Sequence, residues 1–268
     1  ADLSGIFYLH STKKQDLREI QMERTKHRLI WSFLLMLVVM PVLAGSRPDI
    51  YSAYINNKMD RWKAVIDKME SDGNKSNEFL LELINYQYGY IGYCIGFDKK
   101  NEARSYLSLA QKNLDILEKN NFSPGVVHAY KSAFYGFRIG LNPVSAPVNG
   151  LRSIDHAREA VKLDPEHYLG YVQLGNIQFY MPSTFGGSKK EALVHYLKAR
   201  EIMEKDKSAS AGNWNYMSLL IVIGQTYTYL KDYGKARETF DFILGLEPEF
   251  LYVRDDLYPK LLQKIENE

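Results

Sequence analysis

The sequence predicts an all-α protein, an α-solenoid of stacked antiparallel helix pairs that ends in a capping helix. From Asp49 onward, apolar and aromatic residues recur at helical spacing in segments of roughly a dozen or more residues. Gly, Pro, Asn and Asp separate these segments, and no segment alternates for long enough to require a strand. Hydrophobic residues make up 46% of the 268-residue chain, which is enough to build a core, so we do not expect disorder.

The region before the helical segments has the pattern of an export signal. Three basic residues between Arg24 and Arg28 precede an apolar stretch over residues 29–40. That stretch is shorter than the about 20 apolar residues that cross a bilayer. We therefore expect residues 22–44 to be a secretory signal peptide that is cleaved after Ala44. A retained single-span anchor is the alternative.

Residues 1–21 precede this signal and show no clean amphipathic period, so we expect an unstructured leader with Met22 as the natural first residue. A lipoprotein would carry a cysteine directly after the cleavage site, where Gly45 stands. The expected mature part, residues 45–268, is one helical repeat domain. We expect it to be exported, periplasmic or secreted, and to meet a membrane only through an uncleaved signal.

The helical segments group into consecutive pairs joined by turn residues. Two pairs have long connectors, "NPVSAPVN" and "MPSTFGGSKK", and a polar linker, "EKDKSASAGN", precedes the last pair. The expected order is an incomplete or capping pair at 47–71, the pairs 79–97 with 102–117, 126–141 with 150–165 and 171–180 with 190–202, a last pair within 219–248, and a capping helix within 250–267.

The last pair has the clearest repeat pattern. Gly224 and Ala236 are small where the two helices are expected to cross, and Tyr227 and Phe240 are expected to fill the gap between them. Pro248 is expected to stop the second helix. This order resembles the tetratricopeptide repeat, a helix-turn-helix unit of about 34 residues. The resemblance implies a solenoid whose concave face binds ligands, often extended peptides.

The connector at residues 181–193 lengthens one corner of the expected solenoid. Pro182 ends the first helix or starts the turn, and Gly186 and Gly187 tolerate the positive φ that a tight reversal needs. Together with Ala192, these residues resemble the enlarged turn of periplasmic tetratricopeptide proteins associated with TRAP-type solute transporters. That weaker resemblance implies a small organic ligand or a transporter partner.

The end of the same connector contains a helix-start signal. Ser188 and Glu191 have capping-box spacing, so the next helix should begin at Lys189, with each side chain bonding the other residue's backbone N–H. Phe185 is not needed for the turn. It either packs against its own helix pair or reaches over the groove and closes on a ligand.

The sequence contains no catalytic motif that we recognise. It has no H-E-x-x-H, no G-x-S-x-G and no dinucleotide fingerprint, and "GGSKK" lacks the order of a phosphate loop. We expect Cys94, the single cysteine, to be a buried thiol. With 34 basic and 32 acidic residues and no long basic run, nucleic acid is not an expected partner. We expect no enzyme activity, cofactor or metal, since no two of these histidines stand at metal-site spacing: His128, His156, His167 and His195.

The tetratricopeptide resemblance implies that the first helix of each pair lines the concave groove. Several of the tyrosines concerned could instead be core residues between helices. The expected groove lacks lysines at neighbouring positions, which argues against a carboxylate clamp for a peptide terminus. The groove residues implied are Tyr88, Tyr130, Phe137, Val172, Asn176, Phe179, Phe185, Ile221 and Gln225, accompanied by Asn85, Ala133, Leu169 and Ser218.

These observations predict a non-enzymatic module of the cell envelope that binds or scaffolds a protein or peptide partner in its concave groove. One alternative is a small-molecule-binding protein associated with a solute transporter, and a remote one is an enzyme with an unrecognised helical site. A closed pocket at the junction of the second and third pairs would favour a small ligand, and an open aromatic groove would favour a peptide.

Overall fold

The computed structural model describes residues 45–206 and 210–267. By its internal contacts the chain divides into two units, residues 1–46 and Arg47–Glu268, and nearly all described residues belong to the second unit. The expected leader (1–21) and signal peptide (22–44) lie outside the described residues.

All regular secondary structure in these two described stretches is helical, which confirms the predicted all-α class. Most helices fall where hydrophobic periodicity places them. Their bounds are a first helix whose described part covers residues 45–55, α2 (Met59–Glu70), α3 (Asn77–Gly96), α4 (Lys100–Lys119), α5 (Pro124–Leu141), η1 (Pro143–Ser145), α6 (Ala146–Leu163), α7 (Tyr168–Tyr180), η2 (Ser183–Phe185), α8 (Lys189–Glu204), α10 (Trp214–Tyr229), α11 (Tyr233–Leu246), the π-helical turn η3 (Val253–Leu257) and α12 (Tyr258–Glu266).

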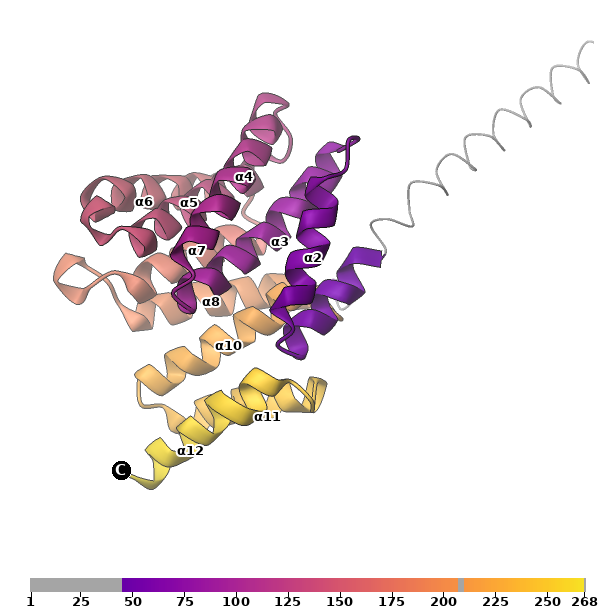
Figure 1. Ribbon diagram of the computed structural model, residues 1–268. Coiled ribbons are helices and arrows are strands. Elements are labelled where there is room, and N and C mark those ends of the chain that lie inside the picture. Colours follow the sequence, from indigo (N-terminus) through magenta and orange to yellow (C-terminus); the bar gives the residue numbers. More distant parts are fainter. Residues whose placement is uncertain (1–44, 207–209, 268) are drawn as a thin grey trace, which may run out of the picture. The chain divides into compact units, whose positions relative to one another are not determined.

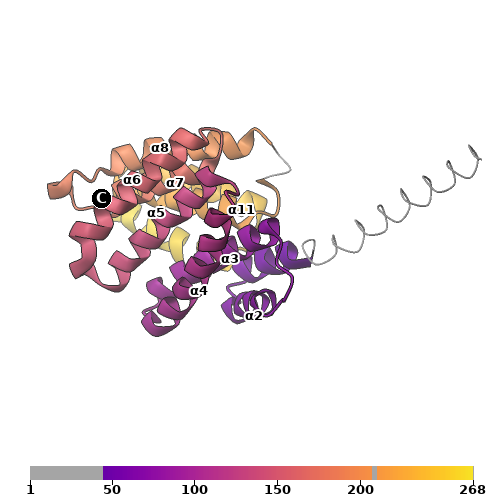
Figure 2. The same cartoon turned by 90° about the horizontal axis from the view of Figure 1, so that it is seen from above.

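Consecutive helices pack as pairs, α3 with α4, α5 with α6, α7 with α8 and α10 with α11, and each pair also contacts a neighbouring pair (Figure 1). Seen from above, α5, α6, α7 and α8 form one continuous stack (Figure 2). The last helix, α12, packs on α11, so the expected capping helix is present.

One predicted boundary is wrong by four residues. The segment 142–149 was expected to be an irregular connector, but it contains η1, and α6 begins at Ala146 rather than at residue 150. Pro147 allows this because it lies in the first turn of α6, where a helix does not use the N–H that proline lacks.

Glycines face aromatic rings where paired helices cross. A Cβ on Gly175 would lie 2.4 Å from Cε1 of Tyr196, and a Cβ on Gly224 would lie 2.5 Å from Cε1 of Phe240. Both rings are fully buried. The small residue lets the helices approach and the ring fills the space, as predicted for Gly224 and Phe240.

The corner at residues 181–193 is a tight turn, and each of its glycines has a different function. Gly186 adopts a left-handed φ of 94°. Gly187 does not, and the positive φ predicted for it is wrong. It is small because a Cβ there would lie 1.9 Å from the carbonyl oxygen of Met181.

The predicted cap of α8 is half confirmed. The helix begins at Lys189, and Ser188 Oγ accepts the N–H of Glu191 at 3.2 Å. The returning bond from Glu191 is wrong, because the N–H of Ser188 instead donates to Gln178, at 3.0 Å to its backbone oxygen and 3.1 Å to its Oε1. In a full capping box the side chain of Glu191 would accept the Ser188 N–H. Here Gln178, near the end of α7, accepts it.

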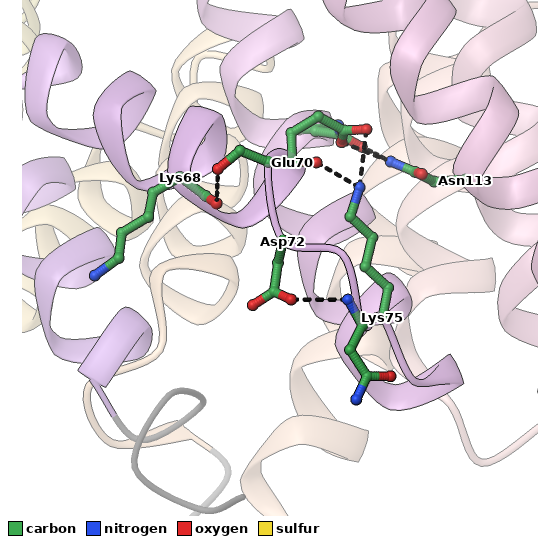
Figure 3. A network of polar contacts seen from close by, with 8 residues as sticks. Lys68, Glu70, Asp72, Lys75 and Asn113 are labelled. Carbon is green, nitrogen blue, oxygen red and sulfur yellow. Dashed lines mark hydrogen bonds and ion pairs between the residues drawn. The ribbon is translucent and has the colours of Figure 1, made fainter.

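A buried polar network joins α2, α3 and α4 (Figure 3). Glu70 Oε2 accepts from Gln87 Nε2 and from Asn113 Nδ2, both at 2.9 Å. Lys75 Nζ lies 3.2 Å from Glu70 Oε1 and donates to the Glu70 backbone oxygen at 2.6 Å. Gln87 and Asn113 are buried, so these bonds meet the requirement that buried amides be paired.

The first helices of the unit also contact its last pair, which an open solenoid does not require. Tyr51 OH donates to Glu247 Oε1 at 2.7 Å, across 196 residues of sequence. The rings of Trp62 and Trp214 lie 5.0 Å apart, and those of Tyr54 and Phe250 lie 5.2 Å apart. In Figure 1 the indigo helices accordingly lie beside orange α10.

We predict that Ser188→Ala lowers the free energy of unfolding by about 1 kcal/mol, because the N–H of Glu191 loses its acceptor. Urea denaturation measures the change. Thr184→Ala is the control, since Thr184 is exposed on the same corner and its side chain has no hydrogen bond with the described residues. Equal stability of the two variants would show that the cap contributes nothing.

We predict that Gly224→Ala destabilises the protein by roughly 1–3 kcal/mol, because the added methyl group overlaps the Phe240 ring. Gly136→Ala is the matched control on α5, where an added Cβ meets no atom within 4 Å. That substitution should stabilise by about 0.5–1 kcal/mol through helix propensity. Thermal unfolding of both variants gives the comparison, and a stable Gly224→Ala protein would contradict the close-packing account.

Candidate ligand-binding cavity

A cavity of about 400 Å³ lies on the inner side of the helix pairs. Its walls come from the first helices of the pairs, α3, α5, α7 and α10, and from segments near the two ends of the unit. The described lining residues are Tyr54, Asn57, Met59, Trp62, Tyr88, Gly89, Gly92, Tyr93, Gly96, Phe97, Phe137, Tyr168, Leu169, Val172, Asn176, Tyr180, Trp214, Asn215, Ser218, Leu219, Ile221, Val222, Gln225, Phe250 and Tyr252.

Glycines on α3 make space for this wall. Gly89, Gly92 and Gly96 recur at helical spacing on the face of α3 that borders the cavity. A Cβ on Gly89 would lie 2.7 Å from Cζ2 of Trp62 and 2.8 Å from Cη2 of Trp214. The two indoles can therefore meet against α3 only because its backbone is bare at this position.

The two tryptophans differ in their hydrogen bonding. Trp62 Nε1 donates to the backbone oxygen of Tyr86 at 3.0 Å. Trp214 is only 6% exposed, and its Nε1 is buried without a nitrogen or oxygen partner among the described residues. Such a donor raises the free energy of the folded state. The rings of Tyr54 and Tyr88 lie 6.0 and 6.2 Å from the Trp214 ring.

Amide side chains at the wall are held by hydrogen bonds. Asn176 Oδ1 accepts from Tyr196 OH at 2.8 Å, and its Nδ2 donates to Gln173 Oε1 at 3.4 Å. Gln173 Nε2 in turn donates to Tyr88 OH at 3.4 Å. Asn215 Nδ2 donates to Asn85 Oδ1 at 3.1 Å. These bonds orient the amides before any ligand arrives.

The described wall carries no charge at neutral pH. It contains no Asp, Glu, Lys, Arg or His among its described residues. Burial raises the pKa of the Tyr54, Tyr88 and Tyr168 hydroxyls above the ordinary value, so they stay protonated. The cavity therefore offers rings, amides and hydroxyls, but no counter-ion for a charged ligand.

The structure brings together six of the nine groove residues predicted from the sequence, along with Leu169 and Ser218. Those six line the cavity from the four first helices: Tyr88, Phe137, Val172, Asn176, Ile221 and Gln225. Stacking between Tyr88 and Phe137, whose ring centroids lie 5.5 Å apart, joins the α3 and α5 walls.

The other three lie elsewhere. Tyr130 is buried behind Tyr88 and donates to Asn85 Oδ1 at 3.2 Å, and Ala133 is buried near it on α5. Phe179 is buried beneath the Lys189 ammonium, which lies 4.1 Å from its ring centroid. Phe185 is 77% exposed on η2. Neither position expected for Phe185, packed on its helix pair or over the groove, is observed.

Part of the wall was missed by reasoning from the sequence. Tyr54, Trp62, Phe250 and Tyr252 come from the segments treated as end caps, which a solenoid does not bring together. The glycine spacing on α3 is a signal that could have been used, because three small residues on one face indicate a close approach by large side chains.

Histidine chemistry was also missed. His128 on α5 and His156 on α6 approach with their Nδ1 atoms 3.0 Å apart, although they are 28 residues apart in sequence. No two of these histidines stand at metal-site spacing in the sequence, and spacing alone did not indicate that the fold would bring His128 and His156 into contact. No group of three or more metal-ligating side chains occurs within the two described stretches.

Two further observations concern reactivity and the membrane. Cys94 is buried on α3 as expected, and burial raises the pKa of its thiol to about 11, so it stays protonated at neutral pH. Among the helices of residues 45–206 and 210–267, none has the length and apolarity needed to span a bilayer.

We predict that stability falls as the pH drops from 7.5 to 5.5. Burial lowers the pKa of His128 and His156, and Lys131 lowers both further, against smaller opposite effects of Glu118 and other carboxylates. Below the ordinary histidine pKa of about 6.5 the unfolded chain therefore binds more protons than the folded chain. Urea midpoints across this range measure the loss.

The double variant His128→Gln, His156→Gln should show a shallower pH dependence, because glutamine does not titrate. His167 and His195 remain in it, and burial lowers their pKa as well, so some dependence should persist. An unchanged slope in the double variant would exclude the His128–His156 contact as a source.

Comparison with known proteins yields a likeness of fold. No family model matches this chain, and no curated protein matches it significantly. The HusA haemophore from Porphyromonas gingivalis is similar in structure, with a TM-score of 0.51 and 16% sequence identity over 68% of this chain and 86% of that one. BtubC from P. vanneervenii is a more distant match, with a TM-score of 0.38 and 15% identity over 72% of this chain and 73% of that one. The likeness to HusA concerns the all-helical fold alone.

Proposed function

We propose that this chain is a non-enzymatic binding module whose cavity takes up a small, uncharged, ring-containing organic ligand. The observation that carries the proposal is the composition of the wall, which has eleven aromatic residues and no charged one among its described lining residues. The volume of about 400 Å³ lies within the range of roughly 300–1,000 Å³ typical of small-molecule sites.

The wall chemistry decides the class of ligand. Aromatic side chains contact a planar ligand by offset stacking or by edge-to-face contact, and the pair Tyr88 and Phe137 presents such rings. Asn176, Asn215 and Gln225 supply donors and acceptors that fix orientation. An ionised ligand would lose its hydration without gaining a counter-ion, which is strongly unfavourable.

A peptide or protein partner is the second candidate. Phe97, Tyr180 and Tyr252 line the cavity and are also exposed, Tyr180 to 75%, so they form an aromatic rim. Aromatic residues are enriched where proteins bind one another. A partner would rest on this rim and insert one uncharged side chain into the cavity.

The assignment to the tetratricopeptide type is also proposed. Its support is the residue order from Gly224 to Pro248, together with the packing of Gly224 against Phe240. Export is proposed from the basic and apolar pattern of residues 22–44. A small ligand agrees with the weaker resemblance to solute-transporter proteins.

The name of HusA supplies a comparison ligand. A haemophore carries haem, and haem has two carboxylates that would need cations or solvent. The described cavity wall has no cation, so haem should bind this chain less well than an uncharged ring system of similar size.

We predict saturable one-to-one binding of the uncharged dye Nile red, measured by its blue-shifted emission. Gly92→Leu should weaken this binding by about tenfold or more, because the new side chain enters the cavity, where a Cβ meets only Cζ of Phe137, at 3.9 Å. Leucine favours helix, so α3 should be retained.

Gly136→Leu is the matched control. Gly136 lies on α5, does not line the cavity, and a Cβ there would meet no atom within 4 Å. Equal binding by the two variants would place the dye elsewhere. A lack of saturable binding would overturn the proposed ligand class. Native mass spectrometry of the purified full chain then separates the two candidates, because a retained peptide and a retained small molecule differ in mass and fragmentation.

A further inference from the structure

A second concavity, of about 550 Å³, lies between α4, the end of α5 and the start of α6. It shares no described lining residue with the aromatic cavity. Its described lining residues are Arg104, Leu107, Ser108, Gln111, Lys112, Arg138, Leu141, Asn142, Ser145 and Asn149.

The charge of this second concavity is of one sign. Arg104, Lys112 and Arg138 converge on it, and none of its described lining residues is acidic. No ion pair joins any of the three to a described carboxylate, whereas Lys63, Lys131 and other cations of the described chain are paired. Arg104 and Lys112 are exposed and Arg138 is half-buried, so water and salt screen part of their mutual repulsion, and a bound anion would relieve the remainder.

Neutral groups hold the two guanidinium groups in place. Arg138 Nη2 donates to Gln111 Oε1 at 2.9 Å, and its Cζ lies 4.8 Å from the Tyr135 ring centroid. Arg104 Nη1 donates to Asn101 Oδ1 at 3.2 Å, and its Nη2 lies 3.5 Å from the Leu141 backbone oxygen. These neutral acceptors orient the two side chains but do not compensate their charge. Each guanidinium has five N–H donors, so donors remain for a ligand.

Asp115 contacts the lining through Gln111 but forms no ion pair with the three cations. Asp115 Oδ1 accepts from Gln111 Nε2 at 2.7 Å, on the opposite end of the amide from Arg138. The amide of Gln111 therefore separates the carboxylate from the guanidinium. It presents its oxygen to Arg138 and its N–H groups to Asp115.

The start of α6 adds a positive partial charge. Ser145 is its N-cap residue, but its side chain caps no helical N–H. Its Oγ instead donates to the backbone oxygen of Asn142 at 2.7 Å. Ser145 and Asn149 both line the concavity, so the 18-residue helix α6 begins at its edge. The N–H of Ala146 donates to the backbone oxygen of Pro143 and Pro147 has no N–H, so α6 contributes the positive end of its dipole and no free first-turn donor from these two residues.

We propose that this second concavity binds a small multivalent oxyanion, a compound with phosphate or clustered carboxylate groups. Arg104 and Arg138 contact the oxygens through their planar N–H forks, and Lys112 adds a mobile point charge. The inference is independent of the aromatic cavity, since the two sites differ in position, lining and ligand charge.

Isothermal titration of the full chain with pyrophosphate and with citrate tests the proposal at low ionic strength. At least one probe should bind with one-to-one stoichiometry, and 0.5 M NaCl should weaken its binding. Arg104→Gln and Arg138→Gln should each weaken binding by about tenfold or more, and Lys112→Gln by several-fold.

Arg158→Gln is the control, because it changes the net charge equally and Arg158 lies on α6 outside the concavity. Substituting Arg138 also removes its contact with Tyr135, so each variant is checked by thermal unfolding. Lys112→Gln keeps the test decisive if Arg138→Gln does not fold, since the exposed Lys112 side chain makes no hydrogen bond or ion pair with the described residues.

Vesicles containing phosphatidic acid distinguish a lipid headgroup from a free compound. If the protein floats with these vesicles and Arg104→Gln abolishes the flotation, the site binds a phosphate headgroup. If only the soluble probes bind, the site binds a free anion. Absence of binding to all three probes would overturn the proposal, as would equal weakening by Arg158→Gln.

Discussion

The contact of Trp62 with Trp214 against the bare backbone of Gly89 is the constraint on which the rest of the unit depends. The three residues come from α2, α10 and α3, and a Cβ at Gly89 would overlap both indoles. This contact turns a stack of helix pairs back on itself, so that the first helices meet the last pair. The inner faces of the pairs then line a cavity that is open at a rim of exposed aromatic residues.

The same physical rule, a small residue opposite a ring, operates at each level of the structure. Within pairs, Gly175 faces Tyr196 and Gly224 faces Phe240. At the cavity, a Cβ on Gly96 would meet no atom of the described residues within 4 Å, and one on Gly92 would meet only Cζ of Phe137, at 3.9 Å. At this site a ring of the ligand would therefore occupy the place opposite glycine that an aromatic side chain occupies within the helix pairs. The unpaired N–H of Trp214 agrees with a wall shaped by ring contacts more than by hydrogen bonds.

Local features could be predicted from the sequence because neighbouring residues determine them. The start of α8 at Lys189 follows from Ser188, and the crossing of α10 and α11 follows from Gly224 and Phe240. Features set by distant residues could not be predicted. No local pattern places Gln178 rather than Glu191 against the N–H of Ser188, and none brings His128 to His156. Six groove residues were predicted because the first helices of the pairs face inward. Trp62 and Phe250 were missed because they reach the wall only through the contact between the first helices and the last pair.

The hydrogen bond from Tyr51 to Glu247 has a consequence for how the unit folds. It joins residues 196 positions apart, and it accompanies the aromatic contacts that link the first helices to the last pair. In an open repeat array, stability accumulates from neighbour to neighbour and the ends can fray independently. Here contacts between the first helices and the last pair limit fraying at both ends. Forming them costs the entropy of closing one long loop, and this cost is met once for the whole unit. Folding should therefore be cooperative and slow for a helical protein, because its decisive contacts are the least local ones.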